Sequence, residues 1–220
     1  MEFRDLGEKR SIQRPSIDYD DLDPYTGPVK GELSLSMVYI DSTDATGATA
    51  EGRISRSVLD RVRLTGTGLS SFDWDDTALK CADLSNARWS GIRLSRAELT
   101  GCRGIGWQLA ASEAGDVYAE DCRFDMATIN VEKVRGVVAF VRCSFKEATF
   151  AGRMDKMVFR DCDLSGAEFA ASSAKGCDLR SSKLDGATGL LSLRGAIIDD
   201  TQTMEVAEQL AKEAGLTVNP

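Results

Sequence analysis

The sequence predicts a solenoid, a fold in which short repeats stack on one another and form a rod. The first observation is a period of five residues, with a large apolar residue at its centre and a small residue two places before it. Residues 82–86 read Ala-Asp-Leu-Ser-Asn, and similar units return at residues 97–101 and from Cys143 to Leu184. A period of five matches neither a helix nor a strand, and a fixed internal period is typical of repeat proteins.

These units resemble the pentapeptide repeat family, whose repeats read roughly Ala, then Asp or Asn, then Leu, then two further residues. The resemblance implies an all-β fold, a right-handed, quadrilateral parallel β-helix in which four pentapeptides complete one coil. It covers about residues 37–189 and is strong at residues 79–99 and 145–184, but degenerate before residue 54 and between residues 104 and 119. In this fold the central apolar residue and the small residue point inward.

The second observation is a recurrence at twenty residues, the spacing expected if four units close one coil. Cys102, Cys122, Cys143 and Cys162 follow one another at intervals of 20, 21 and 19 residues. One inserted residue between positions 134 and 140 and one missing residue between positions 150 and 159 therefore cancel. The cysteines and their central neighbours are expected to stack as core columns, the neighbours being Leu84, Phe124, Phe145, Leu164 and Leu184.

Both ends depart from the repeat. The sequence divides into an N-terminal arm at residues 1–36, the β-helix at residues 37–190 and a C-terminal cap at residues 191–220. Three of the four prolines lie in residues 1–30, which favours an irregular or mobile arm. A docked N-terminal cap is the alternative, with Ile17, Tyr19 and Leu22 as its contacts.

The C-terminal part carries the third observation, apolar residues at helical spacing between a start and a stop signal. Asp200 and Thr201 offer an N-cap, and Gly215 stands just after the expected helix. Solenoids need covered ends, so this short α-helix is expected to cap the last coil. Quinolone-protecting family members dimerise through their C-terminal ends, which implies a homodimer here, with a candidate interface at Met204, Ala207, Leu210, Leu216 and Val218.

Composition indicates where the protein works. No apolar run in the 220 residues reaches the roughly 18 that suggest a membrane span, and the charged N-terminus lacks the apolar stretch of a secretory signal. A cytoplasmic protein is therefore expected. Five of the six cysteines, Cys177 included, fall in the small inward position. Stacking would permit disulfides by distance, but reduced thiols that act as small apolar groups are expected in the cytoplasm.

The sequence predicts a protein without enzymatic activity, metal or cofactor. It has no histidine, which excludes histidine general bases and histidine-ligated metals. Ser172 and Lys175 match a short Ser-x-x-Lys pattern, and Asp161 and Asp163 could form a carboxylate pair. Both sets fall at ordinary repeat positions, so we interpret them as parts of the coil.

Charge is the remaining guide to function. The net charge of −8 discourages direct binding to nucleic acid. The excess lies at the ends, because residues 37–190 carry 22 acidic and 20 basic side chains, whereas residues 1–36 and residues 191–220 each carry a net charge of −3.

On one expected side of the coil, the sign of the charge alternates from coil to coil. Stacked neighbours of opposite sign stabilise a sheet by roughly 0.2–1 kcal/mol per pair, so these residues are expected to fix the register of the coils. The alternative is an acidic interface for a partner. We call them the charge ladder: Arg53, Arg56, Asp73, Asp75, Asp76, Arg93, Arg96, Glu113 and Asp116.

Two functions follow from these features. The favoured one is a non-catalytic protein that acts by binding another protein, with the partner unknown. The alternative comes from the resemblance, because quinolone-protecting relatives bind DNA gyrase, and their acidic rod is thought to imitate the DNA duplex. The chain is similar to the loop-free, mycobacterial type of these relatives, which would protect gyrase from quinolones or a gyrase toxin. A duplex mimic should show one sign along the rod, whereas this ladder alternates.

Overall fold

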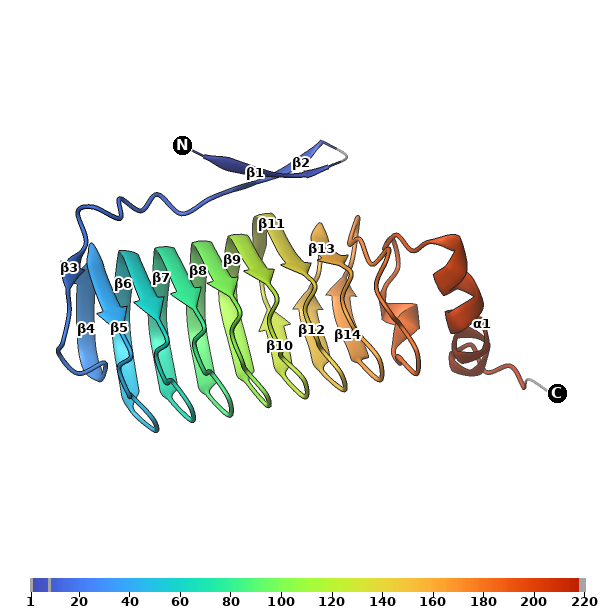
Figure 1. The fold of residues 1–220 in the computed structure, drawn as a ribbon. Coiled ribbons are helices and arrows are strands. Elements are labelled where there is room, and N and C mark those ends of the chain that lie inside the picture. Colours follow the sequence, from blue (N-terminus) through green and yellow to red (C-terminus); the bar gives the residue numbers. More distant parts are fainter. Residues whose placement is uncertain (1, 8, 218–220) are drawn as a thin grey trace.

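The computed structural model describes residues 2–7 and 9–217 and shows a parallel β-solenoid of about 7 turns, with one helix at its C-terminal end (Figure 1). The prediction of an all-β, parallel β-helix with a short C-terminal α-helix is confirmed. Within the described residues, no helix is both long enough and apolar enough to cross a membrane.

The strands follow the rod in chain order, and each coil pairs in parallel with the next. The first coils contain β3 (Asp23–Pro24), β4 (Gly31–Ser36), β5 (Val38–Asp41) and β6 (Thr49–Asp60). The central coils contain β7 (Gly68–Lys80), β8 (Arg88–Thr100) and β9 (Gln108–Glu120). The later coils contain β10 (Thr128–Val131), β11 (Val134–Val141), β12 (Thr149–Arg153), β13 (Met157–Arg160) and β14 (Glu168–Ser173), followed by the 3₁₀ helix η1 (Leu190–Ser192).

Residues twenty apart are paired along the rod. Leu59 pairs with Leu79, and Leu79 pairs with Leu99, which pairs with Ala119. The register of β9 and β11 shifts between Arg135 and Val138, where the inserted residue lies. The register of β12 and β14 shifts between Gly152 and Arg153, next to the missing residue. Both irregularities lie within the intervals predicted from the cysteine spacing.

The core columns are buried along the whole rod. Phe145 has no exposed surface, and its ring centroid lies 5.4 Å from that of Phe124, 5.0 Å from that of Phe140 and 5.1 Å from that of Phe150. The other predicted column residues are also at most 3% exposed: Cys102, Cys122, Cys143, Cys162, Leu84, Leu164 and Leu184.

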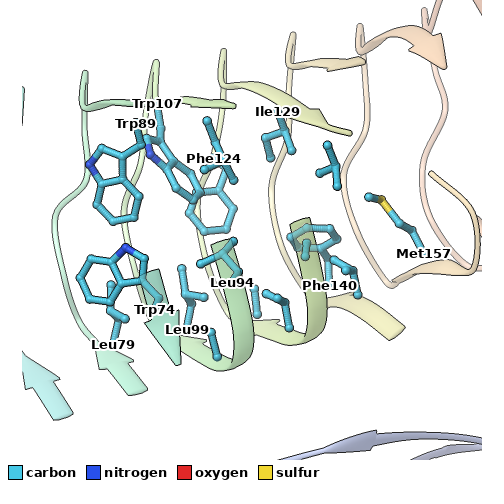
Figure 2. Close-up of a pocket in the computed structure, with 17 residues that line it drawn as sticks. Trp74, Leu79, Trp89, Leu94, Leu99, Trp107, Phe124, Ile129, Phe140 and Met157 are labelled. Atoms are coloured by element: carbon cyan, nitrogen blue, oxygen red, sulfur yellow. The ribbon is translucent and has the colours of Figure 1, made fainter. Parts of the chain in front are cut away.

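The degenerate segment has a packing cause. Trp107 occupies the inward position that Ala87 and Ala127 hold in the neighbouring coils, and its ring lies 5.5 Å from that of Phe124. A Cβ on Gly104 would lie 2.8 Å from the Phe124 ring. In this coil the small residue Gly104 therefore occupies the central position, and the large Trp107 occupies the position that is otherwise small. Figure 2 shows the Trp107 and Phe124 rings next to each other.

One corner of the coil requires a left-handed backbone in successive coils. Arg56, Asp76, Arg96 and Asp116 have φ angles between 46° and 52°. Residues with a Cβ adopt this conformation at a cost and keep it only where the surrounding structure enforces it. Pairing with the coils on both sides supplies that constraint, and the inserted residue lies beside the left-handed Gly136 at the equivalent place.

The N-terminal arm differs from both expectations for it. β1 (Phe3–Gly7) and β2 (Arg10–Gln13) form an antiparallel hairpin that lies against the outer side of the rod (Figure 1). The hairpin buries Leu6 and Ile12, whereas Tyr19 is 55% exposed and Ile17 and Leu22 are half-buried. The arm is therefore docked, but on a side face and mainly through Leu6 and Ile12; of the residues predicted for an end cap, Tyr19 lies against the rod, with the Lys80 Nζ 4.8 Å from its ring centre.

Coil pairing also begins earlier than residue 37. β3 pairs with β5, and β4 pairs with β6 over six residues from Gly31 to Ser36. The division of the chain at residues 36 and 37 remains a prediction, but the paired strands extend across it.

The C-terminal helix α1 (Asp200–Glu213) closes the last coil. Its N-cap is Asp199 rather than the predicted Asp200, because the Asp199 carboxylate accepts from the Gln202 backbone N–H while the Gln202 side chain accepts from the Asp199 N–H. The buried Gln202 amide also donates to the carbonyls of Leu179 and Ser182 at 2.6 and 2.5 Å. The helix ends before Gly215, whose φ is 80°, as the sequence indicated.

Truncation of the central aromatic residue tests the column assignment. Phe145→Ala should lower the free energy of unfolding by about 3–5 kcal/mol, because it opens a cavity among four aromatic rings. Lys146→Ala is the matched control, since its side chain is 55% exposed and pairs with Asp163; it should cost at most about 1 kcal/mol. Equal losses in thermal or urea unfolding would contradict the assignment.

Candidate functional site

The charge ladder forms a run of ion pairs on one outer face. Arg93 pairs with Asp73, and Arg96 pairs with both Asp75 and Asp76, in each case across adjacent coils. Arg53 reaches Asp75 from the preceding coil at 3.5 Å. Each central aspartate therefore meets an arginine from a neighbouring coil.

The ladder continues on the following coils. Arg135 and Lys133 pair with Glu113 at 2.8 and 3.6 Å. The hydrogen bond from Arg135 holds the pKa of Glu113 below its usual value, so this pair stabilises the fold above about pH 4.3, the usual glutamate pKa, and loses its effect as the pH falls further.

Two predicted members of the ladder have other roles. Arg56 donates to the Ser36 hydroxyl at 3.3 Å. Asp116 helps to raise the pKa of Arg96, after the larger effects of Asp76 and Asp75. Asp76 also accepts a 2.9 Å hydrogen bond from the backbone N–H of Ser16 in the N-terminal arm. The ladder thus contacts the arm, which the sequence did not suggest.

The same alternation occurs elsewhere on the rod. Arg61 pairs with Asp41, and Arg142 pairs with Glu120 and Asp121, again across adjacent coils. Arg63 pairs with Asp44 at 2.7 Å on a third column. These contacts join neighbouring coils to each other, so most of the charge on these faces is matched within the molecule.

Charge reversal on the ladder tests its structural role. Asp73→Lys with Asp75→Lys should lower the melting temperature at low salt, because lysines would then face Arg53, Arg93 and Arg96. High salt should restore part of the loss, since exposed charges are screened.

Glu132→Lys with Glu168→Lys makes the same change in net charge at two exposed residues. This control should melt close to the wild-type protein at both salt concentrations. Reversal of Asp73 and Asp75 without loss of stability at low salt would favour an acidic partner interface over a register function.

The stacked cysteines form a column of free thiols. The backbone N–H of Cys102 contacts the Cys122 sulfur at 3.3 Å, and all six cysteines of the chain are free. The neighbouring Cys122 thiol and burial raise the pKa of Cys143 to about 12, and burial also raises the pKa of Cys177 to about 12. Because the thiolate is the reactive species, this column is a chemically inert part of the core.

Thiol counting tests this conclusion. Native protein at mildly alkaline pH should react rapidly at one cysteine, Cys81, which is the exposed one. Denatured protein should react at all six. Cys81→Ser should remove the rapid phase, and rapid reaction of two or more thiols in folded protein would show that the column is accessible.

The catalytic patterns weighed in the sequence are parts of the coil. Ser172 and Lys175 are both exposed on the coil. The hydroxyl of the neighbouring Ser173 and the Lys175 backbone N–H donate to Asp155, which ties two coils together. Asp163 accepts from Ser165 and pairs with Lys146, while Asp161 is a left-handed corner residue. No group of three or more acidic or cysteine side chains suited to a metal ion occurs within residues 2–7 and 9–217.

A cavity of about 40 Å³ lies inside the rod, between the aromatic residues of the central coils (Figure 2). Its lining is made of core residues such as Trp74, Trp89 and Phe140, which are at most 7% exposed. The indole N–H of Trp89 donates to Thr67, a buried hydroxyl. The cavity is a gap in the core packing.

The C-terminal end presents apolar side chains to solvent. Met204 is 82% exposed and Leu216 is 63% exposed, and Ala207 is exposed on the same helix as Met204. Leu210 packs partly against the core, so it belongs to the cap rather than to the outer surface. Val218, the fifth predicted interface residue, lies outside the described residues.

A second surface was missed in the sequence. Leu6 and Ile12 of the hairpin pack on an apolar patch formed by Tyr118, Ala139, Val141 and Val158. The sequence did contain a signal for this surface, because these apolar residues occupy positions of the repeat whose side chains normally face solvent. We call these four residues the side patch.

The comparison with protein-family models agrees with the repeat pattern. A family model described as pentapeptide repeats matches residues 78–103 and 158–188, with 8 copies. A trypsin-treated form of QnrB1, a plasmid-mediated fluoroquinolone resistance protein, is 21% identical over 86% of this chain and 100% of that chain, with a TM-score of 0.45.

HetL, a pentapeptide repeat protein involved in heterocyst differentiation regulation from the cyanobacterium Nostoc sp. strain PCC 7120, is 16% identical over 76% of this chain and 86% of that chain, with a TM-score of 0.25. The comparison with curated protein sequences gave no match.

Proposed function

The chain belongs to the pentapeptide repeat protein family, and we propose that it acts without catalysis, by binding another protein on its outer surface. The observation that carries this proposal is the distribution of its apolar side chains. Five of the eight large hydrophobic residues that are exposed in the described part of the chain lie at the C-terminal end: Leu191, Ile197, Ile198, Met204 and Leu216.

The inside of the rod supports the same proposal. The inward positions are filled by apolar side chains and by thiols of raised pKa, and the chain has no histidine. The polar side chains lie on flat outer faces, where they pair across coils. Free thiols favour a reducing compartment, and we propose the cytoplasm as its location.

The proposed binding can be tested by cross-linking capture from the cells that make the protein. The baits would be the wild-type chain, the ladder variant Asp73→Lys with Asp75→Lys, and Met204→Glu at the C-terminal end. A protein captured by the wild-type chain and lost from one folded variant would support the proposal and locate the interface. Equal capture by all baits and by unfolded chain would contradict it.

One partner at the C-terminal end is proposed to be a second copy of the chain. Met204 and Leu216 are exposed, and Ile197 and Ile198, just before the helix, are each 37% exposed. A two-fold contact would place the same patch on both copies and remove these side chains from water, at roughly 25 cal/mol per Å² of apolar surface.

Met204→Glu should therefore weaken the dimer, because it places a charge in an apolar contact. Thr201→Glu is the matched control, since it adds one charge to an exposed position in the first turn of the same helix. Light scattering over a concentration series should give twice 23.8 kDa for the wild-type and control proteins. Wild-type protein with the monomer mass at every concentration would contradict the dimer.

The alternative function, imitation of the DNA duplex on DNA gyrase, receives less support. Arginines meet the aspartates on the ladder and on a second face, whereas a duplex mimic should present one sign of charge. A gyrase supercoiling and cleavage assay decides between the functions. Inhibition or quinolone protection at low micromolar protein would favour the mimic, and no effect would exclude it.

A further inference from the structure

We propose that the side patch under the N-terminal hairpin is an interaction surface, and that the hairpin is its resident, displaceable occupant. The partner it fits is a short basic β-strand or hairpin with alternating apolar and arginine or lysine side chains. This inference rests on the proposed protein-binding function and names the surface and the chemistry of the partner.

The side patch belongs to a column of outward positions that is interrupted by two carboxylates. The outward positions of successive coils are Tyr39, Val58, Ala78, Glu98, Tyr118, Ala139, Val158 and Asp178. Glu98 and Asp178 show that the coil accepts a carboxylate at this position. Three successive apolar residues there are therefore not required by the solenoid, and Val141 extends them on the same face.

The hairpin shows which chemistry this face recognises. Ile12 is 1% exposed and Leu6 is 4% exposed against the side patch. Arg4 lies 3.7 Å from the centre of the Tyr118 ring and pairs with Glu98 and Glu120 on adjacent coils.

Further arginines extend the same pattern. Arg14 pairs with Glu98 at 3.0 Å, and Arg10 pairs with Asp178 at 3.4 Å, so arginines contact the face on both sides of the apolar pair. The side-chain exposure of these two carboxylates is only 14% and 10%. Departure of the hairpin would therefore leave Glu98 without its arginines and uncover an acidic rim beside an apolar surface.

The attachment is of a kind that can be reversed. β1 pairs only with β2 among the described strands, so no β-ladder joins the hairpin to the rod. Among the described residues, two backbone carbonyls take part in the attachment, and both accept from arginine side chains: Leu6 from Arg160, and Gly176 from Arg10. The Arg4 Nε is buried and has no hydrogen-bond partner within residues 2–7 and 9–217, which weakens the docked state, because an unpaired buried donor is costly.

The edges of the hairpin are also loosely packed. A cleft of about 370 Å³ lies between residues 13–19 and the coils at Ala78 and Glu98, and another of about 200 Å³ lies between Leu6 and Arg180. A two-stranded hairpin is marginally stable alone in water, so its order comes from the contacts with the rod. A partner strand with the same side chains could take over these contacts.

The test uses the full chain and a synthetic peptide of residues 2–14 as the probe. Ile12→Asp should release the hairpin, because it puts a charge against the side patch. Phe3→Asp is the matched control, since Phe3 lies on the same hairpin and is 59% exposed. Fluorescence anisotropy would measure peptide binding, and circular dichroism and melting would show that each variant retains the rod.

We expect the Ile12→Asp protein to bind the peptide at least about tenfold more tightly than the wild-type and Phe3→Asp proteins. In those two proteins the docked hairpin competes with the peptide for the side patch, at an effective concentration of about the millimolar range. Val158→Asp added to Ile12→Asp should abolish binding, and so should a peptide with Arg4 and Arg14 replaced by Gln. A folded Ile12→Asp protein without peptide binding would overturn the proposal, as would binding insensitive to Val158→Asp.

Hydrogen exchange of the wild-type protein provides a test that needs no variant. The amides of β1 and β2 should exchange through an opening of lower free energy than those of β7, β8 and β9. Exchange of all of them in one global unfolding event would overturn the proposal.

The hairpin of a second copy of the chain is the other candidate occupant of the side patch. Mixing two samples of the protein, labelled on the hairpin with different fluorophores, tests this possibility. Energy transfer that grows on mixing would show that the hairpin is exchanged between copies, and it would overturn the assignment to an outside partner. None of these outcomes depends on the partner captured from cells. The proposal for the side patch can therefore be contradicted while the proposed protein-binding function is still supported.

Discussion

The structure depends on one constraint, the stacking of each inward residue on the residue one coil away. Adjacent parallel strands lie about 4.8 Å apart, so a column of side chains such as Phe124, Phe145 and Leu164 fills the rod continuously. A coil of twenty-one residues and the following coil of nineteen keep this stacking, because each register shift is confined to a short segment. The ion pairs, the corners and the caps all follow from this register, because each joins residues that the stacking has placed side by side.

The inward columns could be predicted from the sequence because each coil repeats the same choice of apolar and small residues. The corners could not, since Arg56, Asp76 and Arg96 occupy left-handed positions where no glycine marks the turn. The position of the helix N-cap was missed by one residue, because Asp199 and Asp200 carry the same signal and only the contact with Gln202 distinguishes them. The pairs of the charge ladder were predictable because their spacing is that of the coil.

The docked hairpin lay beyond sequence reasoning for a different reason. Leu6 and Ile12 are two isolated apolar residues in a charged segment, and their partners are more than one hundred residues away in the chain. No local period connects them. The apolar side chains at Tyr118 and Val158, in positions that the repeat leaves to solvent, were the available signal. Apolar residues at outward positions of a repeat therefore indicate covered surfaces better than the inward residues that define the repeat.

The docking of the hairpin also fixes an order of events during synthesis. Arg4 bonds to Glu98, 94 residues later, and Arg10 bonds to Gly176, 166 residues later. The arm therefore leaves the ribosome before the rod, but it makes its last contact only after Asp178 has emerged. Until then the growing rod extends by adding each coil to the one before it, while the N-terminal segment remains available to chaperones or to other newly made chains.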